Sequence, residues 1–398
     1  MKYVVLIPDG ATDHPLDELD GQTPLQAAKT PNLDALASKG VVGVAHTIPE
    51  GMPPGSDVGN LSVFGYDPRQ YYTGRGPIEA ASMGVPLNPR DVVYRCNLVS
   101  TDGEVLLDYS AGHISSEEGR VLIEHLAEEI GSRRFSFYPG VSYRHLLVWR
   151  DGTPEQRCVP PHDIVGKPFE PHLPEGDGEE VLRSLIWDSL EILDEHDINK
   201  RRRDEGLLPA NMIWPWGQGF ALSLPSFFLQ HGVTGAVIAA VDLVRGIGKL
   251  AGFKVVDVPG ATGYLDTNYR GKAEAALNSL EEVDLALIHV EAPDEAGHLG
   301  DIEAKIEAIE RIDRLVVGTL REGLSKFEGG YRMLVMPDHP TPIDCRTHCA
   351  EPVPFVIYDS TNERSGPSIP FDERALEESK LVVEDGWKVM GLLLRGGE

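Results

Sequence analysis

Short apolar runs, each bounded by polar or turn-forming residues, recur along the chain. Five of them predict buried parallel strands, at residues 3–7, 233–241, 283–290, 332–336 and 353–358. Between them, apolar residues recur at helical spacing, most clearly over residues 302–324. Strands that alternate with helices are typical of α/β proteins. We therefore expect a doubly wound, mostly parallel sheet.

The middle of the chain follows a different pattern. From about residue 91 to 216 the apolar and polar positions alternate more, as in "YRHLLVWR", and a Pro- and Gly-rich loop precedes a predicted helix at residues 179–196. Connectors rich in Gly and Pro lie near residues 75–90 and 217–232. We expect a core domain of residues 1–80 and 225–398, and a smaller α+β domain inserted at residues 90–216.

Three of the predicted core strands end in carboxylate or imidazole side chains. "VVLIPDG" delivers Asp9, "LALIHVEAPDEAGH" delivers Asp294 and His298, and "RMLVMPDH" delivers Asp338 and His339. In open parallel sheets the ligand site lies just beyond the carboxyl ends of the strands. These side chains are therefore expected to converge at one edge of the sheet, an outcome that independent helix caps would not produce.

A sixth side chain of this kind, His348, follows in "DHPTPIDCRTHC". Aspartate and histidine are ligands of divalent metals such as manganese or zinc, and six of them are too many for one tetrahedral ion. The pattern favours two metal ions. Such a pair suits hydrolysis or transfer of a phosphoryl group. The alternative is a non-catalytic cluster that only stabilises the fold.

A candidate nucleophile lies in "PEGMPPGSDVGNLSVFGYDP". Ser56 stands in a Gly- and Pro-rich turn before a segment that can open a helix, where backbone N–H groups and the helix dipole favour an anion. The simpler interpretation is that Ser56 is a helix cap.

Charge narrows the range of partners. The chain carries 36 Lys and Arg against 63 Asp and Glu, a formal net charge of −27, which disfavours binding to nucleic acid and to anionic membranes. Apolar runs are too short to span a bilayer, and the N-terminal "MKYVVLIPDG" is too short for a signal peptide. We expect a cytoplasmic enzyme with a small-molecule substrate, and the oligomeric state stays open.

The cysteines predict neither a disulfide framework nor a zinc site. The chain has four of them, Cys96, Cys158, Cys345 and Cys349, too few and too scattered for a framework. Cys345 and Cys349 flank His348, but their spacing lacks the paired C-x-x-C form of structural zinc sites.

Beyond these single features, a series of motifs resembles a known family. The chain resembles cofactor-independent phosphoglycerate mutases of the shorter, archaeal type, within the alkaline phosphatase superfamily. The matching segments run in order over nearly the whole chain: "VVLIPDG", "TPNLDALASKG", "PPGSDVGNLSVFGYDP", "TGRGPIEAASMGV", "DYSAGHIS", "FYPGVSYRHLLV", "PANMIWPWGQG", "PDEAGHLGD", "MPDHPTP" and "THCAEPVPF". The resemblance implies an alkaline-phosphatase-like core with an inserted domain.

The resemblance also implies roles for the strand-end residues. One divalent ion would be held by Asp9, Ser56, Asp338 and His339, and the other by Asp294, His298 and His348. Manganese is the first candidate, with magnesium, cobalt or zinc as alternatives. Ser56 would be the phosphorylated nucleophile. The longer form of the enzyme reads N-S-E-V-G-H around this serine, whereas this chain reads G-S-D-V-G-N, so Asn60 replaces a histidine.

For the substrate, His113 in "SAGHIS" and Arg144 in "VSYRH" resemble binding positions in the inserted domain. Arg201, Arg202 and Arg203 are further candidates for the glycerate carboxylate. The implied reaction is the interconversion of 3-phosphoglycerate and 2-phosphoglycerate in glycolysis and gluconeogenesis, with no requirement for 2,3-bisphosphoglycerate. The alternative is a metal-dependent phosphatase, phosphodiesterase or phosphopentomutase on the same core.

Overall fold

The polypeptide leaves one packed unit after Tyr72 and returns to it at Leu224. In this computed structural model, which describes residues 1–364 and 369–396, one unit comprises Met1–Tyr72 and Leu224–Glu398, and the other comprises Thr73–Ser223. We call them the core unit and the inserted unit. The first limit expected from the sequence was residue 80, but helix α5 (Arg75–Met83) packs against strands of the inserted unit.

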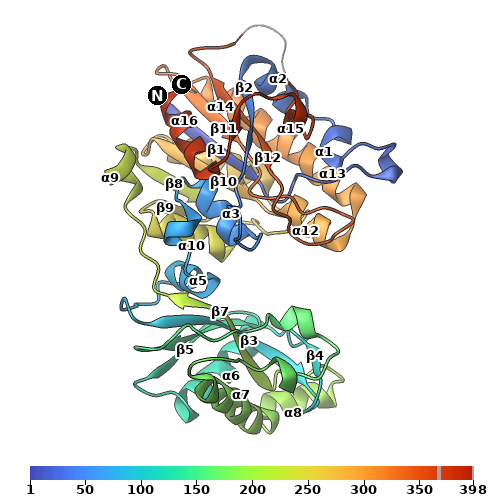
Figure 1. The fold of residues 1–398 in the computed structure, drawn as a ribbon, viewed down its shortest axis with the longest axis vertical. Coiled ribbons are helices and arrows are strands. Elements are labelled where there is room, and N and C mark those ends of the chain that lie inside the picture. Colours follow the sequence, from blue (N-terminus) through green and yellow to red (C-terminus); the bar gives the residue numbers. More distant parts are fainter. Residues whose placement is uncertain (365–368, 397–398) are drawn as a thin grey trace. The chain divides into compact units, whose positions relative to one another are not determined.

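Within the described residues, eight strands form the sheet of the core unit (Figure 1). From one edge to the other they are β13 (Val382–Val383), β2 (Val41–Ala45), β12 (Val353–Asp359), β11 (Tyr331–Val335), β1 (Lys2–Pro8), β10 (Leu285–Val290), β8 (Gly235–Ile238) and β9 (Lys254–Val256). Strands β11, β1, β10, β8 and β9 run parallel. The predicted α/β class with a mostly parallel sheet is confirmed.

One predicted parallel strand runs the other way. Residues 353–358 form most of β12, which pairs antiparallel with β11 and with β2. Antiparallel neighbours can be joined by a loop, whereas parallel neighbours need a crossover such as a helix. The connection from β11 to β12 is a long loop, residues 336–352, and this loop carries His339 and His348.

Helices cover both faces of the core sheet. Helices α2 (Pro31–Lys39), α11 (Tyr269–Ser279) and α14 (Gly318–Leu324) bury Leu36, Ala273 and Leu320 against one face, beside Leu6 and Ile288. Helices α3 (Ser56–Val63), α10 (Asp242–Leu250) and α16 (Val389–Arg395) cover the other, as Figure 1 shows for α3 and α16 in front of the strands. The remaining helices are α1 (Pro24–Ala27), α4 (Pro68–Tyr71), α9 (Phe227–His231), α12 (Ala292–Leu299), α13 (Ile302–Arg311) and α15 (Ala375–Glu378).

The long helix predicted at residues 302–324 is present but not uniform. It begins with α13, passes through a π-helical segment, η4 (Ile312–Val317), and continues as α14 to Leu324. Its apolar residues Ile309, Ile312, Val316 and Leu320 are buried.

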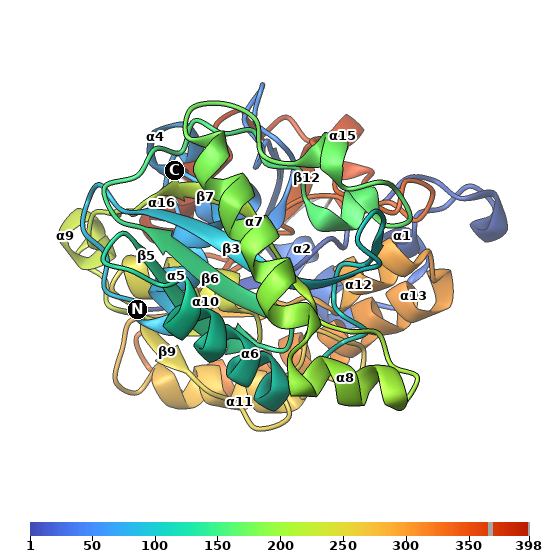
Figure 2. The ribbon, with the colours of Figure 1, turned by 90° about the horizontal axis from the view of Figure 1, so that it is seen from below.

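The inserted unit is an antiparallel sheet with helices on both faces. Residues 73–223, all described, form strands β3 (Val92–Thr101), β4 (Leu106–Asp108), β5 (Phe135–Val141), β6 (Arg144–Trp149) and β7 (Met212–Phe220). Helices α6 (Ser116–Glu129) and α7 (Glu179–Asp194) lie over one face, and α8 (Asp197–Asp204) follows α7 (Figure 2). Ala80 of α5 packs on the other face against Val93 and Val148.

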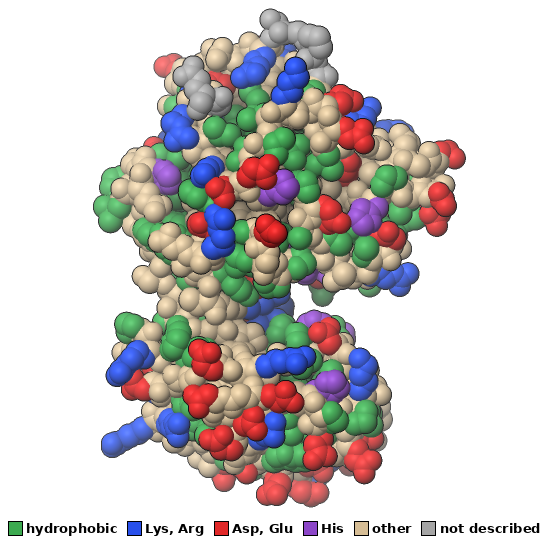
Figure 3. Space-filling view, in the orientation of Figure 1, with side chains coloured by type: hydrophobic (Ala, Val, Ile, Leu, Met, Phe, Trp, Pro, Cys, Tyr) green, Lys and Arg blue, Asp and Glu red, His purple; other side chains and the backbone are tan. Residues whose placement is uncertain are grey.

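The surface is rich in acidic side chains. On the face shown in Figure 3, Asp and Glu side chains gather along the lower edge of the inserted unit. Among the described helices, none has the length and apolar character required to cross a membrane.

Candidate active site

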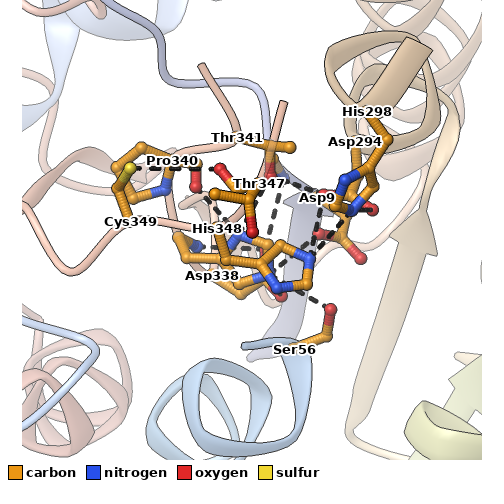
Figure 4. Close-up of polar contacts among 12 residues, drawn as sticks. Asp9, Ser56, Asp294, His298, Asp338, Pro340, Thr341, Thr347, His348 and Cys349 are labelled. Atoms are coloured by element: carbon orange, nitrogen blue, oxygen red, sulfur yellow. Dashed lines mark hydrogen bonds and ion pairs between the residues drawn. The ribbon is translucent and has the colours of Figure 1, made fainter. Parts of the chain in front are cut away.

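The three strand ends meet at one edge of the core sheet. Strand β1 lies between β10 and β11 and pairs in parallel with both. Asp9 follows β1, Asp338 and His339 follow β11, and Asp294 lies in the first turn of α12, directly after β10. In Figure 4 the side chains of Asp9, Asp294, Asp338 and His298 face a common centre, with Ser56 below them. The structure therefore brings together the strand-end residues singled out from the sequence.

Ser56 opens helix α3 and lies against His339. Its Oγ atom is 3.1 Å from His339 Nε2. Asp338 is fully buried, and its Oδ2 atom lies 3.4 Å from the same nitrogen. Since the helix begins at Ser56, the unpaired N–H groups of its first turn favour an anion beside the hydroxyl. The Ser56 hydroxyl and the Asp338 carboxylate thus both lie close to the imidazole of His339.

Asp9 lies between two histidines. Its Oδ2 atom is 2.8 Å from His289 Nε2, and its Oδ1 atom is 3.6 Å from His339 Nε2. Oδ1 is buried and has no hydrogen-bond donor among the residues that the structure describes. Burial, together with the charges of Asp338 and Asp294, raises the pKa of Asp9 well above its usual range. A cation beside Oδ1 would offset the cost of burying the Asp9 carboxylate and its repulsion by Asp338 and Asp294.

A second group of donors surrounds Asp294. Nε2 of His298 lies 3.3 Å from Asp294 Oδ2, and Nε2 of His348 lies 3.6 Å from Asp294 Oδ1. The two Nε2 atoms are 3.0 Å apart. Although burial opposes it, hydrogen bonds from both imidazoles hold the pKa of Asp294 well below its usual range. In return, and again against burial, Asp294 raises the pKa of His298 to about 9.

These donors fit divalent cations. Ligand atoms lie within 4.8 Å of one another in three overlapping groups: Asp9 with Asp338 and His339; Asp294 with His339 and His348; and Asp9 with Glu291 and Asp294. All of them are oxygen or nitrogen atoms, which suit hard and borderline metals. The buried, unpaired Oδ1 of Asp9 is the clearest sign that a positive charge belongs here.

Some residues that hydrogen-bond these donors, or that add a donor to them, were not predicted from the sequence. His289, the last residue but one of β10, hydrogen-bonds Asp9, and burial lowers its pKa to about 3. Thr341 Oγ1 donates to Asp294 Oδ1 at 2.5 Å. Glu291 belongs to the third donor group. The available signal was "LALIHVE", in which His289 and Glu291 interrupt an apolar strand just before Asp294.

Two glycines allow the segments of the site to approach each other. A Cβ atom on Gly59 of α3 would lie 2.5 Å from the backbone oxygen of Asp338. Gly10 has φ +63°, and a Cβ atom there would lie 2.7 Å from Cα of Asp294. A side chain at either position would push α3 or α12 away from the strand ends.

In the inserted unit, His113 and Arg144 lie around one aromatic ring. The rings of His113 and Tyr143 have centroids 6.2 Å apart, and the Arg144 guanidinium lies 5.8 Å from the centroid of Tyr143. The side chains of His113 and Arg144 are exposed. The structure thus brings these two predicted substrate residues together.

The arginine run of α8 is committed to the fold of the inserted unit. Arg201 and Arg202 pair with Glu118 of α6 at 2.5 and 2.7 Å, and Arg203 pairs with Asp194 of α7. Arg202 is buried and also donates to the backbone oxygens of Ala111 and Leu208. The expectation that these arginines bind the substrate carboxylate is therefore not supported, because their guanidinium groups join the helices.

Two arginines that were not singled out from the sequence, Arg75 and Arg95, lie in the same unit as Arg144. Arg95 on β3 is buried, pairs with Glu79 at 3.1 Å and lies over the ring of Trp216 at 4.4 Å. Burial lowers the pKa of Arg95 to about 10, and the charges of Arg75 and Arg144 act in the same direction. Arg75, Arg95 and Arg144 thus form a basic cluster in an otherwise acidic protein.

Comparison with known proteins shows which family the chain belongs to. A family model described as 2,3-bisphosphoglycerate-independent phosphoglycerate mutase matches residues 37–199. A Geobacter sulfurreducens protein named "Probable 2,3-bisphosphoglycerate-independent phosphoglycerate mutase" is 54% identical over 99% of this chain and 100% of its own length. The Methanosarcina barkeri protein named 2,3-bisphosphoglycerate-independent phosphoglycerate mutase is 50% identical over 99% and 100%.

Solved structures extend the comparison to the fold. The PH0037 protein of Pyrococcus horikoshii superimposes with a TM-score of 0.83 at 30% identity, covering 100% of this chain and 98% of the other. A cofactor-independent phosphoglycerate mutase from Thermoplasma acidophilum gives 0.66 at 29% identity, covering 100% of both chains. Because relatives that are 50% and 54% identical cover 99% of it, the chain belongs to the family of 2,3-bisphosphoglycerate-independent phosphoglycerate mutases.

Proposed function

We propose that this protein interconverts 3-phosphoglycerate and 2-phosphoglycerate without 2,3-bisphosphoglycerate, and that Ser56 carries the phosphoryl group between the two half-reactions. The observation that carries the proposal is the convergence of the strand-end Asp and His side chains on Ser56 Oγ. The family to which the chain belongs supports this reaction over hydrolysis by a phosphatase or phosphodiesterase and over a phosphopentomutase.

The metal ligands divide into two sets. We assign Asp9, Ser56, Asp338 and His339 to one divalent ion and Asp294, His298 and His348 to the other, with manganese as the first candidate. A divalent ion bound here supplies positive charge that lowers the pKa of the serine hydroxyl and neutralises the transferred phosphoryl group.

Each half-reaction forms one bond from oxygen to phosphorus and breaks another. In the first, Ser56 Oγ gives up its proton and bonds to phosphorus as the bond from phosphorus to O3 of glycerate breaks, and O3 takes up a proton. In the second, O2 of the retained glycerate gives up its proton and bonds to phosphorus as the bond from phosphorus to Ser56 Oγ breaks, and Oγ regains a proton. The first turn of α3 places backbone N–H groups beside the phosphoserine, which stabilises its charge.

Retention of glycerate separates a mutase from a hydrolase. We assign the carboxylate of glycerate to His113 and Arg144 of the inserted unit, whose side chains lie around Tyr143. A carboxylate held by a guanidinium keeps the alcohol in place while phosphoserine waits. The reaction places the protein in glycolysis and gluconeogenesis, and a cytoplasmic location stays a prediction from the sequence.

The decisive test compares two site variants with wild type. Ser56→Ala should abolish turnover and retain the bound metals, because the serine is one of several ligands but the only nucleophile. Asp338→Ala should lose one ion together with the reaction. Phosphorus NMR would follow 3- and 2-phosphoglycerate, and mass spectrometry of trapped wild type should find one phosphoryl group on the peptide that contains Ser56.

Ser62→Ala is a matched control on the same helix, since Ser62 donates to the backbone oxygen of Thr47 and not to a ligand. It should retain turnover. Full activity after exhaustive chelation, or isomerisation by Ser56→Ala, would overturn the proposal. Release of inorganic phosphate as the main product would instead identify a hydrolase.

A further inference from the structure

The loop between β11 and β12 carries ligand groups that face two ways. His348 turns to the candidate active site, where its Nε2 atom lies 3.0 Å from that of His298. In Figure 4 the sulfur of Cys349 lies beside Pro340, away from the His348 imidazole. Cys349 therefore faces away from the site of His348.

The thiols belong to a separate ring of donor groups. The Cys345 thiol interacts with the carboxylate of Asp344 and with the thiol of Cys349, and the Cys349 thiol interacts with the carboxylate of Glu351. The thiol of Cys349 donates to the backbone oxygen of Thr347 at 3.9 Å. Nδ1 of His14 lies 3.1 Å from both carboxylate oxygens of Asp344, and His14 Nε2 lies 3.7 Å from Glu351 Oε1. His14, Asp344 and Cys345 thus form a compact group, with Cys349 and Glu351 beside it.

A buried frame holds the two segments that supply these donors. Asp13, next to His14, accepts a hydrogen bond from the backbone N–H of Ile343 at 3.1 Å, next to Asp344. Lys305, fully buried, donates to Asp13 Oδ2 at 2.7 Å and to the backbone oxygen of Thr341 at 2.8 Å. His14 and the Asp344 end of the loop are therefore positioned by packing rather than by the surface contact alone.

The spacing and the chemistry of the ring match a thiophilic metal. Ligand atoms of His14, Asp344 and Cys345 all lie within 4.8 Å of one another. Donors that share one zinc ion at bond lengths of about 2.0–2.3 Å stand roughly 3–4 Å apart, so small rotations suffice. Thiolate and imidazole ligands select zinc-class ions over magnesium or manganese.

We propose that His14, Asp344, Cys345 and Cys349 form a further metal site that binds a zinc-class ion, with Glu351 at its rim. The thiols give up their protons to solvent as the ion binds. His14 is separated from the cysteines by most of the chain, so the imidazole that completes this site was invisible in the cysteine spacing. An ion here ties the loop that carries His348 to the segment after β1. The site shares no ligand with the proposed catalytic ions.

The test uses cobalt added to the reduced, full-length protein with manganese in excess. Thiolate ligation gives cobalt an intense charge-transfer absorption, and the catalytic donors, all nitrogen or oxygen, cannot produce it. Wild type should show this band and saturate at one equivalent. The band should disappear in Cys345→Ser/Cys349→Ser, which should keep its activity with manganese, and in His14→Ala.

Two variants serve as controls and should keep the band: Cys158→Ser, a thiol in the inserted unit, and His348→Ala, a proposed catalytic ligand. Zinc should also slow alkylation of Cys345 and Cys349, measured by peptide mass spectrometry. Absence of the band in wild type shows that the ring is only a surface ion pair beside two thiols. A band that survives the double serine variant, or that needs His348 and not His14, equally overturns the proposal.

Discussion

At the scale of the residue, Asn60 holds two parts of the candidate site at once. It is fully buried, and its Nδ2 atom donates to Asp338 Oδ2 at 2.7 Å and to the backbone oxygen of Ser56 at 2.9 Å. Groups that orient metal ligands in this way commonly matter nearly as much as the ligands.

Asn60→Asp should lower metal affinity or turnover by about 10- to 100-fold. The change removes the side-chain donor to Asp338 Oδ2 and to the backbone oxygen of Ser56, and it places a second carboxylate against Asp338. Metal affinity can be measured by competition with a chelating dye, and turnover by phosphorus NMR.

Asn199→Asp is the matched control, because Asn199 is equally buried and donates to the backbone oxygens of Leu193 and Ala210, within the inserted unit. It should destabilise the fold yet leave metal affinity unchanged. Equal loss of metal affinity in both variants would mean that Asn60 acts through stability alone.

Glu373 gives the fold a pH dependence of its own. Burial raises its pKa to about 7, from 4.5, although Thr23 Oγ1 and the backbone N–H of Asp13 donate to its carboxylate. Between these two values the folded state binds more protons than the unfolded state, so the free energy of unfolding falls as pH rises. Glu373→Gln cannot ionise and escapes this loss. Its advantage over wild type should grow from pH 4.5 to 7, by at most about 3 kcal/mol, and then level off.

Urea unfolding of wild type and Glu373→Gln at several pH values measures this difference. Parallel stability curves across the window would show that Glu373 ionises equally readily in both states.

Most of the strand-end donors could be predicted from the sequence, because polar residues that end buried strands stand out in an apolar pattern. His289 also interrupts an apolar strand, but this break does not tell which side chain the histidine meets. Its role depends on the register of β10 with β1, which pairs it with Ile7 and so places it near Asp9. Register is a tertiary property, and a single histidine inside a strand gives no sign of it. The same holds for His14, whose partners lie on a distant loop.

At the scale of the element, the predicted helix at residues 302–324 shows what periodicity omits. The apolar spacing fixed its position and its buried face, but not the π-helical segment Ile312–Val317. This wider turn contains Asp313, which serves a different helix: Oδ1 accepts from the backbone N–H of Leu33 at 2.7 Å, and Oδ2 accepts from Asn32 Nδ2 at 3.1 Å. Asp313 thus caps the N-terminus of α2 from outside.

Asp313→Ala should therefore destabilise the protein by about 1–2 kcal/mol, the usual cost of a lost helix cap. Glu303→Ala, an exposed position on α13 of the same long helix, should change stability by less than about 0.5 kcal/mol. Urea unfolding measures both. A loss no larger at Asp313 than at Glu303 would show that α2 does not depend on this cap.

Of the strands that the sequence did not predict, β9 and β13 lie at the two edges of the core sheet and are three and two residues long, whereas β2 lies next to the edge and is mostly buried. Edge strands bury less apolar surface, so their pattern is weaker. The direction of β12 was also wrong in the prediction, because strand direction follows from the connection and not from composition.

At the scale of the whole molecule, two units with separate cores divide the candidate chemistry. The metal donors and Ser56 lie in the core unit, whereas His113, Arg144 and the basic cluster with Arg95 lie in the inserted unit. Because the cores are separate, a change in one unit that leaves its fold intact should not disturb the other site. Binding of substrate and binding of metal can therefore be tested independently.

His113→Ala and Arg144→Ala should each weaken isomerisation while metal stoichiometry stays unchanged. Loss of a group that positions the substrate costs transition-state stabilisation without unfolding the core, so kcat/KM should fall in both variants. Arg133→Ala, an exposed position elsewhere on the inserted unit, controls for the loss of surface charge and should behave as wild type. Metal analysis and phosphorus NMR on the same samples separate the two effects. If either variant lost bound metal, that residue would act on the core unit and not on glycerate. If both retained full kcat/KM, the glycerate carboxylate would have to be held by other residues, and Arg75 and Arg95, beside Arg144, would be the next to change.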